Sequence, residues 1–157
     1  ELWYLPVGEK EPRVYLKSSF GVSHGQFSPN GHWVAYASNE SGKWEVYVAP
    51  FPGPGGNWKI SAAGGSEPRW RGDGKELFYL APDGKLMAVA VNEGPPFEAG
   101  AATALFQTRR RERISATDLF SYDVSADGQR FLVNSDVGEV SSSPLTLLFN
   151  WNTEAGR

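Results

Sequence analysis

The sequence predicts an all-β protein built from a repeated unit of short antiparallel strands. Three observations lead to this prediction: a phrase of ten residues that occurs three times, a composition rich in aromatic residues, and frequent Gly and Pro. The copies of the phrase begin at Phe27, Trp70 and Val124, and each contains an apolar residue, a short polar or small stretch, Asn-Gly or Asp-Gly, and an apolar strand. Because Asn-Gly and Asp-Gly tolerate positive φ angles, each copy predicts a hairpin tip with a type I′ turn.

The glycines of these turns carry a specific expectation. Hairpins of this kind need left-handed backbone at the turn, so we expect φ > 0 at Gly31, Gly74 and Gly128. A second glycine follows each of them after 10 or 11 residues, at Gly42, Gly84 and Gly138. This constant step predicts a second turn in every copy.

The remaining strands follow in order from these turns. Directly after the first turn we expect strands at 32–38, 76–80 and 130–134, and after the second turn strands at 44–49, 86–91 and 145–151. Fourth strands are predicted at 58–61 and 103–107, each after a Pro/Gly-rich loop. Segments 2–7 and 13–17 are predicted to be the third and fourth strands of a preceding unit.

Four short antiparallel strands per ~42 residues are typical of a β-propeller blade. The sequence therefore divides into blade pieces 1–20, 22–62, 66–108 and 118–151, followed by a polar tail at 152–157. These pieces predict a partial β-propeller, with about three four-stranded blades plus incomplete terminal blades. Closed propellers use about 4 to 8 blades, so we expect a homodimer that closes the ring, with a small self-capped or four-bladed monomer as the alternative.

The composition excludes several classes of function. Six Trp, six Tyr and nine Phe favour strands, and 18 Gly and 11 Pro provide turns between them. A formal net charge of −3 argues against a nucleic-acid partner. The chain has no cysteine, and no apolar run approaches the ~18 residues of a membrane span, so we expect no disulfide and no direct membrane insertion.

Because it begins at Glu1 inside an expected strand, we interpret the chain as a piece of something longer or as a processed product.

The repeated unit also resembles a known family. Residues 27–36 (FSPNGHWVAY), followed by Ser38-Asn39-Glu40-Ser41-Gly42 and by EVYV at 45–48, are similar to the repeat of TolB-like (WD-like) β-propellers, with Asn30 where that repeat usually has Asp. Residues 68–79 and 122–131 resemble the C-terminal propellers of bacterial membrane-anchored serine/threonine kinases, and 147–151 resembles their closing strand. The resemblance implies an extracytoplasmic location, periplasmic or at the cell surface, while the lack of cysteine is compatible with the cytoplasm as well.

No motif predicts a metal site or a cofactor. Asp73, Asp83 and Asp127 each precede Gly, so we expect these carboxylates to bind their own turn backbone. A calcium loop would need oxygen ligands at alternating positions, which no segment offers. His24 and His32 have no carboxylate partner at a spacing typical of metal ligands, and we expect structural roles for both.

Catalytic motifs are missing as well. The chain has no G-x-S-x-G elbow, and the segment 64–68 (GGSEP) is interpreted as a crossover between blades. The segment 53–56 (GPGG) lacks the Lys-Ser/Thr of a phosphate-binding loop. The basic run at 109–113 (RRRER) is expected to be a solvated loop, with a contact to an acidic partner as the alternative.

The innermost strands of the predicted blades hold the candidate binding residues. At the mouth of a central channel, Arg, Asp and aromatic side chains together suit a small ligand or a peptide, although channel filling with water is the simpler interpretation. These candidate residues are Gln26, Arg69, Trp70, Arg71, Tyr122 and Asp123. We therefore predict a non-enzymatic module that binds or senses a ligand or protein. The alternatives are an accessory propeller of a larger enzyme, a kinase or a prolyl-oligopeptidase-type peptidase, and a hydrolase with its site at the channel mouth.

Overall fold

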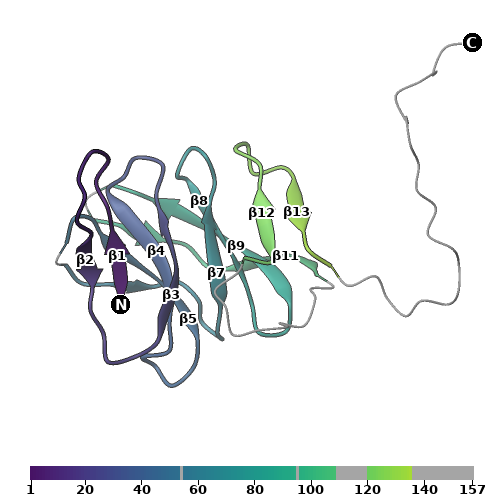
Figure 1. The fold of residues 1–157 in the computed structure, drawn as a ribbon. Coiled ribbons are helices and arrows are strands. Elements are labelled where there is room, and N and C mark those ends of the chain that lie inside the picture. The colour runs from purple at the N-terminus through teal and green to yellow at the C-terminus, as the bar shows by residue number, and fades with distance from the viewer. Residues whose placement is uncertain (54, 95, 109–119, 136–157) are drawn as a thin grey trace, which may run out of the picture.

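The computed structural model describes residues 1–53, 55–94, 96–108 and 120–135, and its regular elements are all β-strands (Figure 1). The predicted all-β class is confirmed. No helix that could cross a membrane occurs in these four ranges.

Thirteen strands are present in the described residues. They are β1 (Leu2–Tyr4), β2 (Arg13–Leu16), β3 (Val22–Phe27), β4 (Trp33–Ser38), β5 (Glu45–Pro50), β6 (Trp58–Lys59), β7 (Ser66–Trp70), β8 (Glu76–Leu80), β9 (Lys85–Asn92), β10 (Glu98–Ala99), β11 (Thr103–Gln107), β12 (Tyr122–Val124) and β13 (Phe131–Val133).

The strands form four small antiparallel sheets. In chain order, the first sheet is the hairpin of β1 and β2, and the second is formed by β3 to β6 in sequence order. In the third sheet β7, β8 and β9 follow in order, while both β10 and β11 pair with β9. The fourth sheet is the hairpin of β12 and β13. Two short strands therefore share the edge where the sequence predicted a single fourth strand.

The strand bounds agree closely with those predicted from the repeat. Strands β8 and β11 have the expected bounds, and most others differ by one or two residues at an end. The first strand is shorter than expected, ending at Tyr4 two residues before Pro6, whose ring nitrogen cannot donate a ladder hydrogen bond. The predicted strand at 145–151, the turn at Gly138, the basic run at 109–113 and the tail at 152–157 lie outside the described residues.

The hairpin turns confirm the predicted positive φ. Gly31, Gly74 and Gly128 have φ of 72°, 73° and 71°. The type I′ prediction is wrong, because Asn30 is not among the non-glycine residues with positive φ, as such a turn would require. Instead the Gly31 N–H donates to the Ser28 carbonyl at 2.9 Å, and the glycine ends a four-residue turn of the kind that favours Pro second and Gly fourth.

The turn carboxylates bind the backbone as predicted. Asp73 Oδ1 accepts from the Lys75 N–H at 3.0 Å, and Asp127 Oδ1 accepts from the Gln129 N–H at 3.0 Å. The hydrogen bond from Arg71, followed by the one from the Lys75 backbone, lowers the pKa of Asp73 to about 2. These aspartates therefore stay ionised and hold the hairpin tips.

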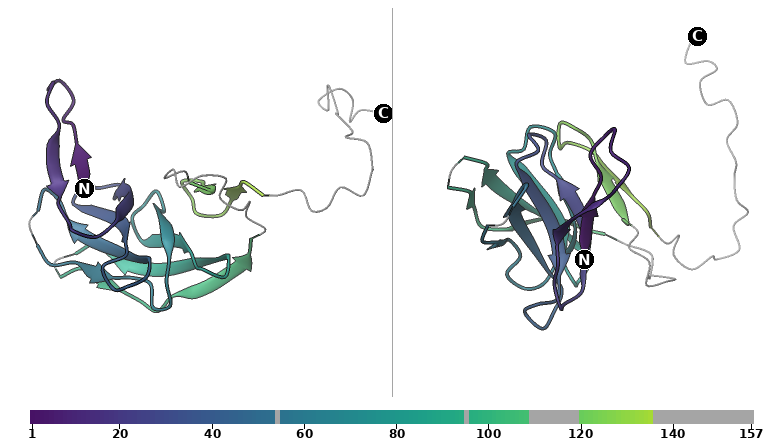
Figure 2. Two further views of the ribbon diagram at one scale, coloured as in Figure 1. Left: turned by 60° about the horizontal axis from the view of Figure 1, so that its bottom comes forward. Right: turned by 60° about the vertical axis from the view of Figure 1, so that its left-hand side comes forward.

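The sheets stack face to face, and their cores lie between them (Figure 2). The first strand of the third sheet, β7, lies against both β3 and β4 of the second. The largest core joins these two sheets, and its buried members are Ala35, Val46, Val48, Ile60, Trp70, Leu77, Tyr79, Val89, Val91 and Phe97. Smaller cores join β1 and β2 to the second sheet and β12 and β13 to the third.

A buried carboxylate holds the crossover between the second and third sheets. Glu45 is fully buried, and it accepts hydrogen bonds from the Ser61 hydroxyl and, at 2.9 Å, from the Gly64 N–H. Its charge is balanced by Lys43 and Lys59, whose Nζ atoms lie 3.4 and 3.6 Å from Oε1. The loop that leads into β7 is therefore tied to β5 by polar contacts as well as by packing.

Two turn glycines should differ in their tolerance of a side chain. A Cβ added at Gly31 meets nothing within 4 Å, whereas at Gly74 it lies 2.1 Å from Glu93 Oε2. We expect Gly31→Ala to cost about 1 kcal/mol through its left-handed backbone. Gly74→Ala should cost more, because displacing Glu93 breaks its 3.0 Å hydrogen bond from Asn30 Nδ2. Urea denaturation measures both costs, and equal values would contradict this packing.

Candidate functional site

The first strands of three sheets carry a row of polar side chains at equivalent positions. The row consists of the last residue but one of each strand, directly before the hairpin turn. These residues are Gln26 on β3, Arg69 on β7 and Asp123 on β12. The strand register confirms the equivalence, because it pairs Gln26 with Ala35, Arg69 with Phe78, and Asp123 with Leu132. The repeat therefore places these three residues side by side.

Arg69 lies at the centre of this row. Its Nη1 donates to Gln26 Oε1 at 3.4 Å, and its Nε lies 3.7 Å from Asp123 Oδ1. Its guanidinium carbon also lies 3.8 Å from the centre of the Phe120 ring, a typical cation–π distance. Three sheets thus meet at one guanidinium group.

The hydrogen-bonding capacity of Arg69 is only partly used. Guanidinium has five N–H donors. Nε is buried without a hydrogen-bond partner among the described residues, since 3.7 Å to Asp123 is too long for a hydrogen bond. The 3.4 Å contact with Gln26 is itself long. Because the Arg69 side chain is 23% exposed, a ligand oxygen would have to bind at its Nη groups and not at the buried Nε.

Two strained residues lie beside this row. Among the described residues, His24 and Glu67 are the non-glycine positions with positive φ, at 54° and 58°. Both fall at shifts of the strand register, between Ser23 and Gln26 in β3 and at the matching place in β7. Such backbone costs about 1–3 kcal/mol, persists only where the surroundings impose it, and is common at ligand sites.

Glu67 fixes the start of β12. Its side chain is fully buried and accepts hydrogen bonds from the backbone N–H and, at 3.0 Å, the hydroxyl of Ser121. Its main-chain oxygen accepts from the Tyr122 hydroxyl at 2.9 Å. Burial, and then the nearby Glu67 charge, raise the pKa of Tyr122 well above its usual value, so the phenol remains a donor. These contacts hold Phe120 and Asp123 next to Arg69.

His24 and Phe120 complete the site. His24 is buried, and its Nδ1 lies 2.9 Å from the Ser23 hydroxyl. Its ring meets the Phe120 ring edge to face, with centroids 5.0 Å apart. Sequence reasoning gave His24 a structural role and did not select Glu67 or Phe120. His24, Glu67 and Phe120 lie three or four residues before the copies of the repeated phrase. An alignment extended that far upstream would have placed them beside the polar row.

The side chains of the other three predicted site residues do not join this row. Trp70 and Tyr122 are buried in the cores between sheets and do not line an opening, although Trp70 Nε1 donates to the Gln26 carbonyl at 3.2 Å. Arg71 turns to the hairpin tip, where its Nε donates to Asp73 Oδ1 at 2.6 Å. The structure therefore brings together three of the six predicted residues.

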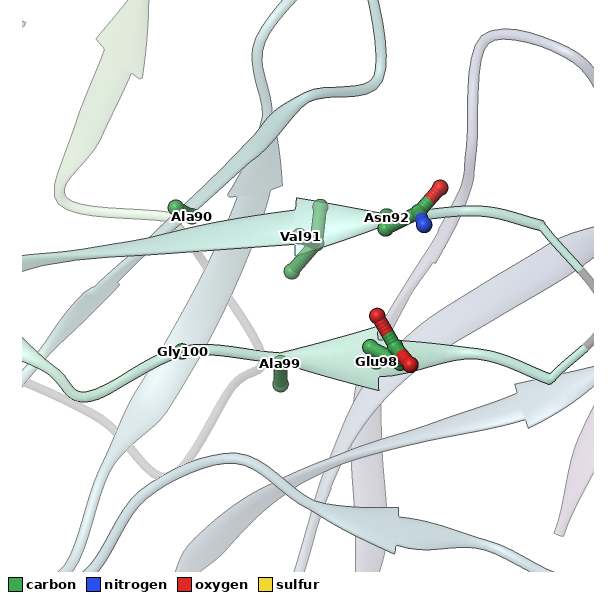
Figure 3. A pocket seen from close by; sticks show the side chains of 6 residues that line it. All are labelled: Ala90, Val91, Asn92, Glu98, Ala99 and Gly100. Atoms are coloured by element: carbon green, nitrogen blue, oxygen red, sulfur yellow. The ribbon is translucent and has the colours of Figure 1, made fainter.

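The described surface also contains shallow pockets away from this row. One, of about 570 Å³, runs along the paired ends of β9 and β10 and is lined by the segments 90–92 and 98–100 (Figure 3). Among these described lining residues Asn92 and Glu98 have the polar side chains, and they lie together at one end (Figure 3). Across the four described ranges, no group of three His, Asp or Glu side chains is placed to hold a metal ion.

No protein-family model matches the chain, and no curated protein matches it. The resemblance to TolB-like propellers therefore stays a prediction.

The contacts of Glu67 predict a graded loss of stability. Ser121→Ala removes one hydroxyl hydrogen bond and should lower the free energy of unfolding by about 1 kcal/mol. Glu67→Ala also leaves the backbone N–H of Ser121 without its acceptor, and should cost about 2–3 kcal/mol. Urea denaturation of both variants tests this order, and a neutral Glu67→Ala would show that β12 is held in another way.

Proposed function

We propose that the chain forms blades of a β-propeller and acts as a non-enzymatic binding or sensing module, whose ligand binds at Arg69. The observation that supports this function most directly is the partly used guanidinium of Arg69, which lies between Gln26 and Asp123 beside two strained bulges. Preorganised polar groups of this kind suit recognition of a small ligand or a peptide.

The sheet arrangement supports the propeller. Each of the two larger sheets runs outward in sequence order from an innermost strand, and successive sheets pack face to face. Their innermost strands β3 and β7 lie side by side, and β12 continues the series. Repeated small antiparallel sheets arranged radially are the architecture of propellers.

The charges at the site indicate the chemistry of the ligand. Arg69 offers N–H donors for a carboxylate or carbonyl oxygen, and its geometry favours planar oxygen groups. The Asp123 side chain is 64% exposed and offers an acceptor for an N–H or ammonium group. Amino acids and peptides contain both a carboxylate or carbonyl oxygen and an N–H or ammonium group, and we propose them as the ligand class.

A binding assay can test this function. We expect isothermal titration calorimetry with a panel of free L-amino acids and tripeptides to identify at least one ligand of the wild-type chain. Arg69→Ala should weaken its binding by about tenfold or more, because a charge-assisted hydrogen bond is lost. Arg130→Ala is the matched control. The Arg130 side chain is 81% exposed, and its Nη2 lies 3.7 Å from Asp127 Oδ2, a long ion-pair distance. Absence of binding across the panel, or unchanged binding by Arg69→Ala, would overturn the proposal.

A further inference from the structure

We propose that Asn30 is a site of deamidation, and that Glu93 opposes the carboxylate formed there and so weakens the contact between the second and third sheets. The modification takes place in the hairpin tip between β3 and β4, and Glu93 lies directly after β9. The proposal is independent of ligand binding at Arg69.

Two other hairpin tips of the repeat hold an aspartate next to an arginine. Asp73 accepts hydrogen bonds from Arg71 Nε at 2.6 Å and from Arg71 Nη2 at 2.9 Å. In the last hairpin, Asp127 Oδ2 lies 3.7 Å from Arg130 Nη2. A negative charge at this position of the turn is therefore matched by a positive charge in both tips.

The tip at Asn30 has the opposite arrangement. Asn30 occupies the equivalent position, and its Nδ2 donates to Glu93 Oε2 at 3.0 Å. The Glu93 carboxylate is confined there, because a Cβ at Gly74 would lie 2.1 Å from Oε2 and because Oε1 is buried. A neutral amide suits this carboxylate, whereas a second carboxylate at position 30 would place two like charges about 3 Å apart.

The residue after Asn30 is the nucleophile of the reaction. The sequence contains a single Asn-Gly pair, Asn30-Gly31. In deamidation the Gly31 nitrogen attacks Asn30 Cγ; the new N–Cγ bond forms as the Cγ–Nδ2 bond breaks, and the Gly31 N–H proton leaves with Nδ2 as ammonia. Water then opens the five-membered imide at either carbonyl, which gives aspartate or isoaspartate at position 30.

The structure of the tip favours this attack. The space beside Gly31 is open, since an added Cβ would meet nothing within 4 Å. Asn30 Oδ1 gains negative charge during the attack, and it already accepts from the Ser28 hydroxyl at 2.7 Å and from the His32 N–H at 2.9 Å. The Gly31 N–H donates to the Ser28 carbonyl at 2.9 Å and must leave it first, but an exposed hairpin tip opens at low cost.

The product acts on a contact between two sheets. Three interactions hold the segment after β9 to the second sheet. They are the hydrogen bond from Asn30, the 3.2 Å hydrogen bond from Trp33 Nε1 to the Glu93 carbonyl, and the contact of Phe97 with the Trp33 ring, at a centroid distance of 4.9 Å. A carboxylate at position 30 removes the first interaction and adds repulsion beside the second. Because Phe97 remains buried, the sheets should stay packed while the tip separates from Glu93.

Peptide mapping by mass spectrometry tests the modification. After incubation of the wild-type chain at neutral pH, trypsin releases the peptide 18–43, which contains both Asn30 and Asn39. We expect conversion at Asn30 to be about tenfold or more faster than at Asn39, because the side chain of Glu40 shields the nitrogen that would attack Asn39. Gly31→Ala should slow conversion at Asn30 toward the rate at Asn39.

Substitutions test the role of Glu93. Asn30→Asp imitates the product and should lower the midpoint of urea denaturation. Asn30→Asp/Glu93→Gln should recover most of this loss, because the amide at position 93 can donate to the carboxylate at position 30. The matched control is Asn39→Asp, which adds the same charge but keeps the acceptor for the Gly21 N–H, now at 2.8 Å, and should leave the midpoint nearly unchanged.

The loss caused by Asn30→Asp should depend on pH. Burial raises the pKa of Glu93; the Ser28 hydrogen bond and the His32 charge lower it, and the Asp73 charge raises it. A carboxylate at position 30 raises this pKa further, and a proton shared by the pair removes the repulsion. Because a carboxyl group whose pKa is raised by folding stabilises the fold as pH falls, the difference in midpoint from the wild type should shrink under mildly acidic conditions.

Other results would overturn the proposal. An unmodified Asn30, or equal rates at Asn30 and Asn39, would show that the tip does not undergo the reaction. An Asn30→Asp variant as stable as the wild type, or a double variant as unstable as Asn30→Asp alone, would show that Glu93 does not oppose the new charge. Ligand binding at Arg69 is measured separately, so these results would leave the proposed function intact.

Discussion

The packing of each sheet against a neighbouring sheet is the constraint on which the rest of this structure depends. Hairpins and small sheets of this size are marginal in water unless another element covers an apolar face. In the largest core, Ala35 and Val48 of one sheet are buried together with Trp70 and Leu77 of the next. The side chains at equivalent strand positions are buried where a neighbouring sheet covers them, as at Phe78. They are exposed where none of the described residues covers them, as at Leu132.

Polar contacts decide how the stacked sheets are aligned. Apolar faces allow sliding, whereas a buried carboxylate requires its partners at defined positions. Glu45 holds the crossover after β6 through Ser61 and Gly64, and Glu67 holds the approach to β12 through Ser121. The polar row at Arg69 lies next to Glu67, so the geometry of the candidate site follows in part from the contacts that orient the sheets.

Sequence reasoning succeeded where the cause of the structure is local. The positive φ of Gly31 and Gly74 and the backbone contacts of Asp73 follow from turn chemistry within a few residues. It failed where a choice depends on context. The type I′ turn was wrong because Asn-Gly suits more than one hairpin loop. Trp70 was placed at an opening because a strand position does not show which neighbouring sheet will cover its side chain.

The sequence by itself determined the all-β class and the repeated strand–turn unit of this protein, because alternation and turn residues act over short distances. Only the tertiary structure decided which residues meet between units. Gln26 and Arg69 are 43 residues apart, and Glu67 and Ser121 are 54 apart, so no local pattern relates them. The left-handed conformations of His24 and Glu67 also belong to the tertiary structure, because positive φ is uncommon for non-glycine residues and the surrounding sheets must impose it.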